Sequence, residues 1–207
     1  MEMVLDVYKH PFDPKFPVVC VDESPQQLIG ETKITIQASP GHVSRYDYEY
    51  RRCGVCTIFM ACEPLAGKGM VKITERKTKS GWAHFLKDIA DRYLGDEKIT
   101  LIMNNLNTHT PGALYETFNP DKAKSLWNRF EFIYTPKHGS WLNMAEIDLN
   151  VLLGQCLNRR IDNIDKVMSE VAAWQNHRNN KDAKVNRHFR TDDARIKSSR
   201  LYPSIES

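Results

Sequence analysis

The pattern of apolar and polar residues predicts several strands followed by an alternation of helices and strands. Short β-branched or apolar runs bounded by polar, Gly or Pro residues indicate buried strands. These runs are Val18–Asp22, Val55–Ala61, Met70–Thr74, Ile99–Met103 and Phe130–Tyr134. Two further segments alternate in the period-two pattern of more exposed strands, Gln27–Gln37 and the aromatic and acidic stretch Tyr46–Tyr50.

Helical periodicity begins after the predicted strand Met70–Thr74. Apolar residues recur at i, i+3, i+4, i+7 and i+11 and predict an amphipathic helix that ends before Gly95. They are Trp82, Phe85, Leu86, Ile89 and Tyr93. Further helices are predicted at Gly112–Phe118, Asp121–Trp127, Asn143–Leu157 and Ile164–Trp174, the last with Asn163 or Asp162 as N-cap.

This order predicts an α/β fold with a mixed five-stranded sheet and helices on both faces. An antiparallel meander comes first, and parallel strands joined by helices follow. The first 17 residues contain three prolines and are expected to lack regular structure.

Composition narrows the class of protein. The chain has 207 residues, 41% hydrophobic and 27% charged, which suits one domain with a sizeable core. Its apolar runs are too short to span a bilayer and no leader pattern follows Met1, so a cytoplasmic protein is expected. Five cysteines do not predict a disulfide framework, and Cys53 and Cys56 have CxxC spacing without a second pair of ligands.

Charge is unevenly distributed. The net charge is only +3, but residues 178–200 hold eight Lys or Arg against three Asp. Such a segment is either a solvated basic tail or a surface that contacts phosphates.

The candidate functional residues lie at the ends of predicted strands. Asp22 and Glu23 follow the first strand, and a polar run containing Asn104, Asn105, Asn107 and His109 follows Ile99–Met103. Polar groups at the carboxyl ends of neighbouring strands are where open α/β sheets hold their sites. The plainer interpretations are a turn or cap residue for Asp22 and solvated histidines in loops.

Three segments resemble the catalytic domain of bacterial insertion-sequence transposases of the mariner superfamily. They are VVCVDESPQQLIGE (18–31), LIMNNLNTHTPGALYE (101–116) and YTPKHGSWLNMAEID (134–148), and the segment from Thr191 to Pro203 resembles the end of such proteins. The resemblance implies a DDE endonuclease with a ribonuclease-H-like, retroviral-integrase-like fold. It divides the chain into a linker-like lead-in (1–17), a catalytic domain (18–180) and a basic C-terminal extension (181–207).

The family uses three carboxylates to hold two divalent metal ions, Mg²⁺ or Mn²⁺. Matching motifs place the first at Asp22 and the third at Glu146, while the second falls on Asn104. An amide oxygen can bind Mg²⁺ but brings no charge, so metal binding is expected to be weakened. Glu146 at the start of a helix is also favoured by the helix dipole alone.

The resemblance implies double-stranded DNA as partner, as transposon ends and a TA target. Lys137, His138 and Trp141 precede Glu146, where they could contact DNA, although Trp141 is equally compatible with core packing. The paired helices of a recognition module do not precede Val18, so end recognition is expected to come from a separate helix-turn-helix polypeptide or to have been lost. A homodimer is a further expected assembly.

Two functions remain open from the sequence. One is a metal-dependent DNA endonuclease and strand transferase impaired by Asn104, and the other is a non-catalytic remnant that binds DNA or a transposase subunit. A ribonuclease for RNA:DNA hybrids is a weaker alternative, because the matching motifs belong to transposases.

Overall fold

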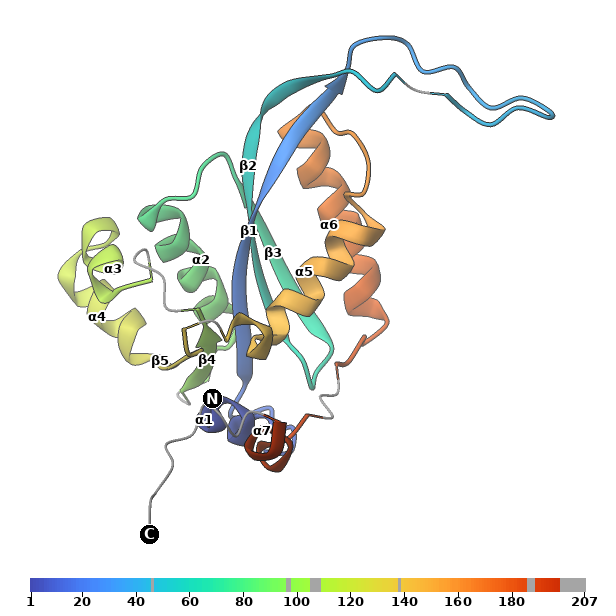
Figure 1. Ribbon diagram of the computed structural model, residues 1–207. Helices are drawn as coiled ribbons and strands as arrows, with labels where there is room; N and C mark the ends of the chain where they lie inside the picture. The colour runs from blue at the N-terminus through green and yellow to red at the C-terminus, as the bar shows by residue number, and fades with distance from the viewer. Residues whose placement is uncertain (46, 96–97, 105–108, 138, 186–188, 198–207) are drawn as a thin grey trace.

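The structure is a computed structural model of the chain (Figure 1). It describes residues 1–45, 47–95, 98–104, 109–137, 139–185 and 189–197. Asn105, Asn107 and His138 lie outside the described residues, as does Tyr46.

A mixed five-stranded sheet forms the centre of the fold, in the order β3–β2–β1–β4–β5. The strands are β1 (Val18–Glu31), β2 (Tyr50–Glu63), β3 (Lys68–Thr74), β4 (Ile99–Met103) and β5 (Phe130–Tyr134). The first three form an antiparallel meander, and β4 and β5 continue the sheet parallel to β1. This arrangement confirms the predicted sheet.

Helices cover both faces of the sheet, as the sequence predicts (Figure 1). One face carries α2 (Lys79–Arg92), α3 (Pro111–Thr117) and α4 (Pro120–Asn128). The other carries α5 (Met144–Gln155), which follows the short 3₁₀ helix η1 (Ser140–Leu142), and α6 (Ile164–Asn180). Two short helices, α1 (Glu2–Val7) and α7 (Thr191–Lys197), contact each other at the foot of the sheet.

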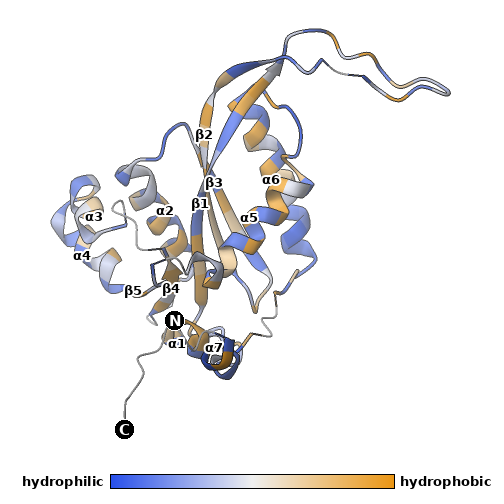
Figure 2. Cartoon of the chain, viewed as in Figure 1, coloured by the Kyte–Doolittle hydropathy of each residue, from blue (hydrophilic) through white to orange (hydrophobic). Residues whose placement is uncertain are grey.

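The side chains of the central strands point alternately to the two faces of the sheet and so contribute to a hydrophobic cluster on each face. In β1, Val19 and Val21 belong to the hydrophobic cluster beneath α2, whereas Cys20 belongs to the cluster beneath α5 and α6. Successive side chains of a strand point to opposite faces, so a strand covered on both sides is apolar throughout. Figure 2 shows the resulting concentration of hydrophobic residues in the sheet.

Helix α2 confirms the predicted amphipathic stripe. Trp82, Phe85, Leu86 and Ile89 are all buried against the sheet. The Thr78 hydroxyl accepts a hydrogen bond from the Gly81 N–H (2.9 Å) and so caps the first turn.

Strand β1 is longer than the sequence predicts. It joins the two strands that were predicted separately, Val18–Asp22 and the beginning of Gln27–Gln37, and continues through Pro25 to Glu31. Beyond Val21, β1 pairs with β2 alone, because β4 ends at Met103. An edge strand uses only alternate N–H groups in its ladder, so a proline can be accommodated there.

The predicted strand at Tyr46–Tyr50 is wrong, because only Tyr50 belongs to β2. The described residues between β1 and β2 extend away from the body of the molecule (Figure 1), and Tyr48 is 85% exposed. Period-two alternation gives a strand only where a neighbouring backbone supplies hydrogen bonds.

The expectation of an irregular N-terminus is also wrong. Residues Glu2–Val7 form α1, and Val4 and Leu5 are buried in the core beneath α5. The prolines begin only at Pro11, after the helix has ended. A six-residue helix is too short to be stable by itself, so its packing against the core maintains it.

We predict that Phe85→Ala lowers the free energy of unfolding by about 3–5 kcal/mol, because it removes a fully buried ring and leaves a cavity. Leu94→Ala provides the control, since Leu94 is 89% exposed and its truncation is expected to change stability by less than about 0.5 kcal/mol. Urea denaturation followed by circular dichroism measures both. Equal losses in the two variants would contradict this description of the core.

Candidate active site

Asp22 and Asn104 lie side by side at the carboxyl ends of two adjacent parallel strands. Val21 of β1 pairs with Met103 of β4, so the residue after each pair emerges at the same edge of the sheet. The Asn104 Nδ2 donates a hydrogen bond to Asp22 Oδ1 (3.1 Å). The predicted adjacency of the two positions is therefore confirmed.

The Asn104 side chain is held at both of its polar atoms. Its Nδ2 faces Asp22, while its Oδ1 accepts a hydrogen bond from the Thr135 hydroxyl (2.8 Å). Thr135 directly follows β5 and is buried, and its N–H donates to the Met103 carbonyl (3.0 Å). In this orientation the amide presents a donor, not an acceptor, to the carboxylate of Asp22.

Glu146 reaches the site from the first turn of α5, and Asn143 sets the position of that turn. The fully buried Asn143 donates through Nδ2 to the Val21 carbonyl (2.8 Å) and accepts through Oδ1 from the Ala145 N–H (3.2 Å). One side chain thus caps α5 and joins it to the strand end that carries Asp22. Glu146 Oε2 is buried without a hydrogen-bond partner among the described residues.

The two acids influence each other electrostatically. Burial raises the pKa of Asp22 to about 6, because it penalises the charged carboxylate. The negative charges of Glu146 and Glu23 raise it further, whereas the bond from the Glu23 N–H to Asp22 Oδ1 (2.9 Å) opposes them. A site that disfavours its own negative charge is suited to receiving a cation.

Glu23 belongs to a separate polar cluster that supports the Asn104 loop. Its buried carboxylate pairs with Lys77, and its Oε2 lies 3.4 Å from His109 Nε2. Although burial alone would raise the pKa of Glu23, these two partners hold it below its ordinary value. The His109 Nδ1 donates to the Asn104 carbonyl oxygen (3.1 Å), and its ring stacks on Trp82 at a centroid distance of 5.2 Å.

These contacts correct the plainer interpretation of His109 as a solvated loop histidine, since only 3% of it is exposed. Periodicity identifies Trp82 as a core residue but does not show that it stacks on His109. Thr135, Lys77 and Asn143 were not singled out either, because their partners are distant in the sequence.

Asp148 is the remaining acid near Glu146, and it faces elsewhere. Its carboxylate is buried and pairs with Arg178 of α6. It therefore joins two helices and is not directed at Asp22.

The polar atoms fit one divalent cation better than two. Asp22 and Glu146 are hard oxygen donors, and the buried unpaired Oε2 of Glu146 is the atom that a cation would satisfy. The described residues contain no group of three or more Asp, Glu, His or Cys side chains placed to hold a metal ion, and the position beside Asp22 is the amide of Asn104. Its amide would have to turn its oxygen away from Thr135 to become a ligand.

The other predicted site residues lie before α5. Lys137 is exposed, and Trp141 in η1 is 45% exposed with its ring edge-on to Phe189 (5.3 Å between centroids). Lys197 Nζ lies 5.7 Å from the centre of the Phe189 ring. Trp141 is thus half-exposed at the surface beside Phe189, which itself has Lys197 over its ring.

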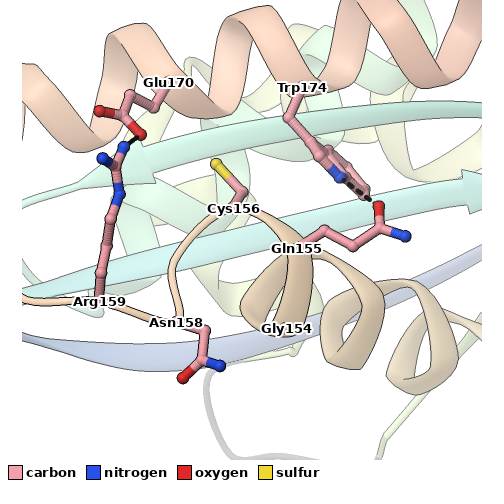
Figure 3. A pocket seen from close by; sticks show the side chains of 7 residues that line it. All are labelled: Gly154, Gln155, Cys156, Asn158, Arg159, Glu170 and Trp174. Carbon is pink, nitrogen blue, oxygen red and sulfur yellow. Dashed lines mark hydrogen bonds and ion pairs between the residues drawn. The ribbon is translucent and has the colours of Figure 1, made fainter. Parts of the chain in front are cut away.

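A pocket of about 330 Å³ lies at the opposite end of α5 (Figure 3). Its lining residues are Gly154, Gln155, Cys156, Asn158, Arg159, Glu170 and Trp174. Trp174 donates to Gln155 Oε1 (3.1 Å), and Arg159 pairs with Glu170. Gly154 is eight residues from Glu146, or about 12 Å along a helix, so this pocket is not part of the candidate site.

The sheet order and the helices on both faces define a ribonuclease-H-like fold. Structures of the Mos1 mariner transposase share it: a paired-end complex with Mn (TM-score 0.57, 14% identity) and one with the left transposon end (TM-score 0.58, 15% identity). The matches cover 88% and 89% of this chain but only 56% and 53% of the Mos1 chains. This chain therefore spans little more than half the length of these similar proteins.

Residues 17–168 match the family model described as DDE superfamily endonuclease, and the chain belongs to that family. No curated protein sequence matches the chain. Within the described residues, no helix is long and apolar enough to cross a membrane.

We predict that stability falls with rising pH through the titration of Asp22. Its folded-state pKa of about 6 exceeds the ordinary 3.8, so its contribution is fully present below pH 3.8 and is lost as pH rises through 6. Relative to Asp22→Asn, the unmodified chain is expected to lose up to about 3 kcal/mol of unfolding free energy between pH 4 and 7. Urea denaturation with a chelator present measures the difference, and parallel pH profiles would contradict it.

Proposed function

We propose that this chain is the catalytic domain of a DNA transposase whose DNA cleavage is strongly impaired by Asn104. The observation that carries the proposal is the convergence of three side chains in a DDE-family fold. Asp22 and Asn104 emerge from adjacent parallel strands, and Glu146 approaches from α5.

The proposed reaction is transfer of a DNA phosphodiester. In hydrolysis, a water oxygen attacks phosphorus, one P–O ester bond breaks, and the leaving oxygen takes a proton. In strand transfer, a DNA 3′-hydroxyl replaces the water. Bound Mg²⁺ or Mn²⁺ supplies activation of the attacking oxygen and stabilisation of the leaving oxygen.

The protein's own residues hold the charge that such a site needs. Asp22 and Glu146 would hold the cation through their carboxylate oxygens, and Asp22 becomes anionic above its pKa of about 6. Asn143 fixes the distance between the two acids, because it joins the start of α5 to the Val21 carbonyl.

Asn104 limits the reaction through charge. Two carboxylates offset only two of the four positive charges of a metal pair, and an amide adds none. The amide also donates its N–H to Asp22, which occupies an oxygen that a metal would use. This interaction is the one observation that supports a second candidate function, a DNA-binding protein that does not cut.

The proposed DNA surface lies beside the start of α5. Lys137 provides an exposed cation for phosphate contact, and the half-exposed Trp141 provides a ring on which an unpaired base can stack. His138, which lies outside the described residues, completes the set proposed from the sequence. Lys197 of α7, which is exposed, is proposed as a further phosphate contact.

The proposed partner is double-stranded DNA, as transposon ends and a TA target. The two Mos1 structures described above are paired-end complexes. A second copy of this chain or a separate helix-turn-helix polypeptide is proposed as a further partner.

We predict that Asn104→Asp restores metal-dependent nicking of supercoiled DNA. A third carboxylate returns the charge that stabilises the transition state, so the rate is expected to rise by roughly three or more orders of magnitude. Nicking in Mg²⁺ and in Mn²⁺, measured by gel conversion of supercoiled to open-circular DNA, gives the rates.

The matched control is the double variant Asn104→Asp/Glu146→Gln, which retains the new acid and removes another ligand. It is expected to nick no faster than the unmodified chain. Equal nicking by the unmodified chain and by Asn104→Asp would show that Asn104 is not the impairing residue. Absence of nicking in every variant, with DNA binding retained, would favour the non-catalytic function.

We also predict weak, sequence-independent binding of duplex DNA that falls steeply with salt. Lys137→Ala is expected to reduce the slope of log affinity against log salt by about 1, because one phosphate contact is lost. Lys124→Ala removes the same charge from the exposed side of α4 and should leave the slope unchanged. Fluorescence anisotropy at several salt concentrations measures the slope for each protein. Equal slopes for the unmodified chain and both variants would exclude Lys137 from the interface.

A further inference from the structure

The Tyr8 hydroxyl connects the N-terminal segment to the start of α5. It donates a hydrogen bond to the Leu142 carbonyl (3.0 Å) and accepts one from the Met144 N–H (3.4 Å). Its oxygen also lies 3.2 Å from Cys20 Sγ. Tyr8 follows α1 and lies outside the matched family region, which begins at residue 17.

These contacts use the full hydrogen-bonding capacity of the hydroxyl. A tyrosine hydroxyl has one proton to donate and two lone pairs to accept with. Because the proton goes to Leu142, the remaining positions receive the Met144 N–H and the Cys20 thiol. Burial raises the pKa of Tyr8, so the hydroxyl keeps the proton that it donates.

The bonded groups belong to the two elements that carry the acids of the site. Met144 is the first residue of α5 and lies two residues before Glu146. Cys20 lies two residues before Asp22 in β1. Tyr8 therefore joins the strand and the helix on which the separation of Asp22 and Glu146 depends, and Asn143 joins them a second time through the Val21 carbonyl.

Helix α1, which leads into Tyr8, is itself held by the C-terminal helix α7. Thr191 donates from its hydroxyl to Asp6 Oδ1 (2.8 Å). Arg195 donates to both carboxylate oxygens of Glu2 (2.6 and 3.0 Å), which is a bidentate pair. Helices α1 and α7 thus form one unit beneath the sheet (Figure 1), and Tyr8 joins this unit to the start of α5.

We propose that Tyr8 is a positioning residue for the cation site of Asp22 and Glu146. Tyr8 precedes the matched family region, yet its hydroxyl helps to set the position of Asp22 and Glu146. The proposal rests on the proposed function for the cation site. The same contacts also stabilise the first turn of α5 whether or not a cation binds.

The test compares Tyr8→Phe with Val171→Ala, each in the Asn104→Asp chain. Tyr8→Phe removes only the hydroxyl and leaves the ring in place. Val171→Ala removes buried methyl groups from α6 in the same hydrophobic cluster but leaves Tyr8 and its partners unchanged. Mn²⁺ affinity, amide hydrogen exchange of Met144–Glu146 and thermal melting are measured for all three proteins.

Tyr8→Phe is expected to weaken Mn²⁺ binding on the order of tenfold, as loss of a residue that orients a ligand does. It should also accelerate exchange of the Met144 amide about fivefold or more, since that N–H loses its acceptor. Val171→Ala is expected to lower the melting temperature more than Tyr8→Phe does. Its Mn²⁺ affinity should stay within about twofold of the parent, because its contacts are independent of the site.

Two outcomes would overturn the proposal. One is unchanged exchange at Met144–Glu146 in Tyr8→Phe, and the other is equal loss of Mn²⁺ affinity in Val171→Ala, which would indicate only general destabilisation. If the Asn104→Asp parent binds no Mn²⁺, the proposed cation site fails, and with it the positioning role. Faster exchange in Tyr8→Phe would then still show that the hydroxyl stabilises the start of α5, so the two failures are distinguishable.

Discussion

The parallel pairing of β1 with β4 is the constraint on which the candidate site depends. Backbone hydrogen bonds fix the register of Val21 against Met103, so the next residues, Asp22 and Asn104, meet at one edge of the sheet. The two side chains are brought together by the backbone, because the hydrogen bonds between β1 and β4 fix the position of both residues. A one-residue slip of either strand would turn its side chain to the opposite face of the sheet and separate Asp22 from Asn104.

The amide of Asn104 makes this edge of the sheet stable without a cation. Three carboxylates in one buried place repel one another and need positive charge to offset the repulsion. Here the second position donates a hydrogen bond to Asp22 and is held from behind by Thr135. An amide at this position therefore adds no negative charge to the buried edge of the sheet, which favours the folded protein.

The acidic residues around the site do not all have the same role. Glu23 and Asp148 lie within two residues of Asp22 and Glu146, yet each is neutralised by its own cation, Lys77 or Arg178. Because a buried carboxylate needs a partner, these pairs leave only Asp22 and Glu146 directed at the site. Proximity in sequence to a catalytic position therefore does not indicate a shared role.

The amino-acid sequence was sufficient to predict most strands and helices and the candidate site positions, but not α1 or the irregular course of the chain before Tyr50. Periodicity predicted α2, β4 and β5, because burial on one or both faces imposes a spacing on apolar residues. The motifs predicted Asp22 and Asn104 as neighbours. Tertiary structure alone decided which partners each polar group finds. Single-sequence patterns carry no information on contacts between residues such as Tyr8 and Met144, whose separation of 136 positions is closed only by folding. For the same reason α1 was missed, since its stability comes from the core it covers.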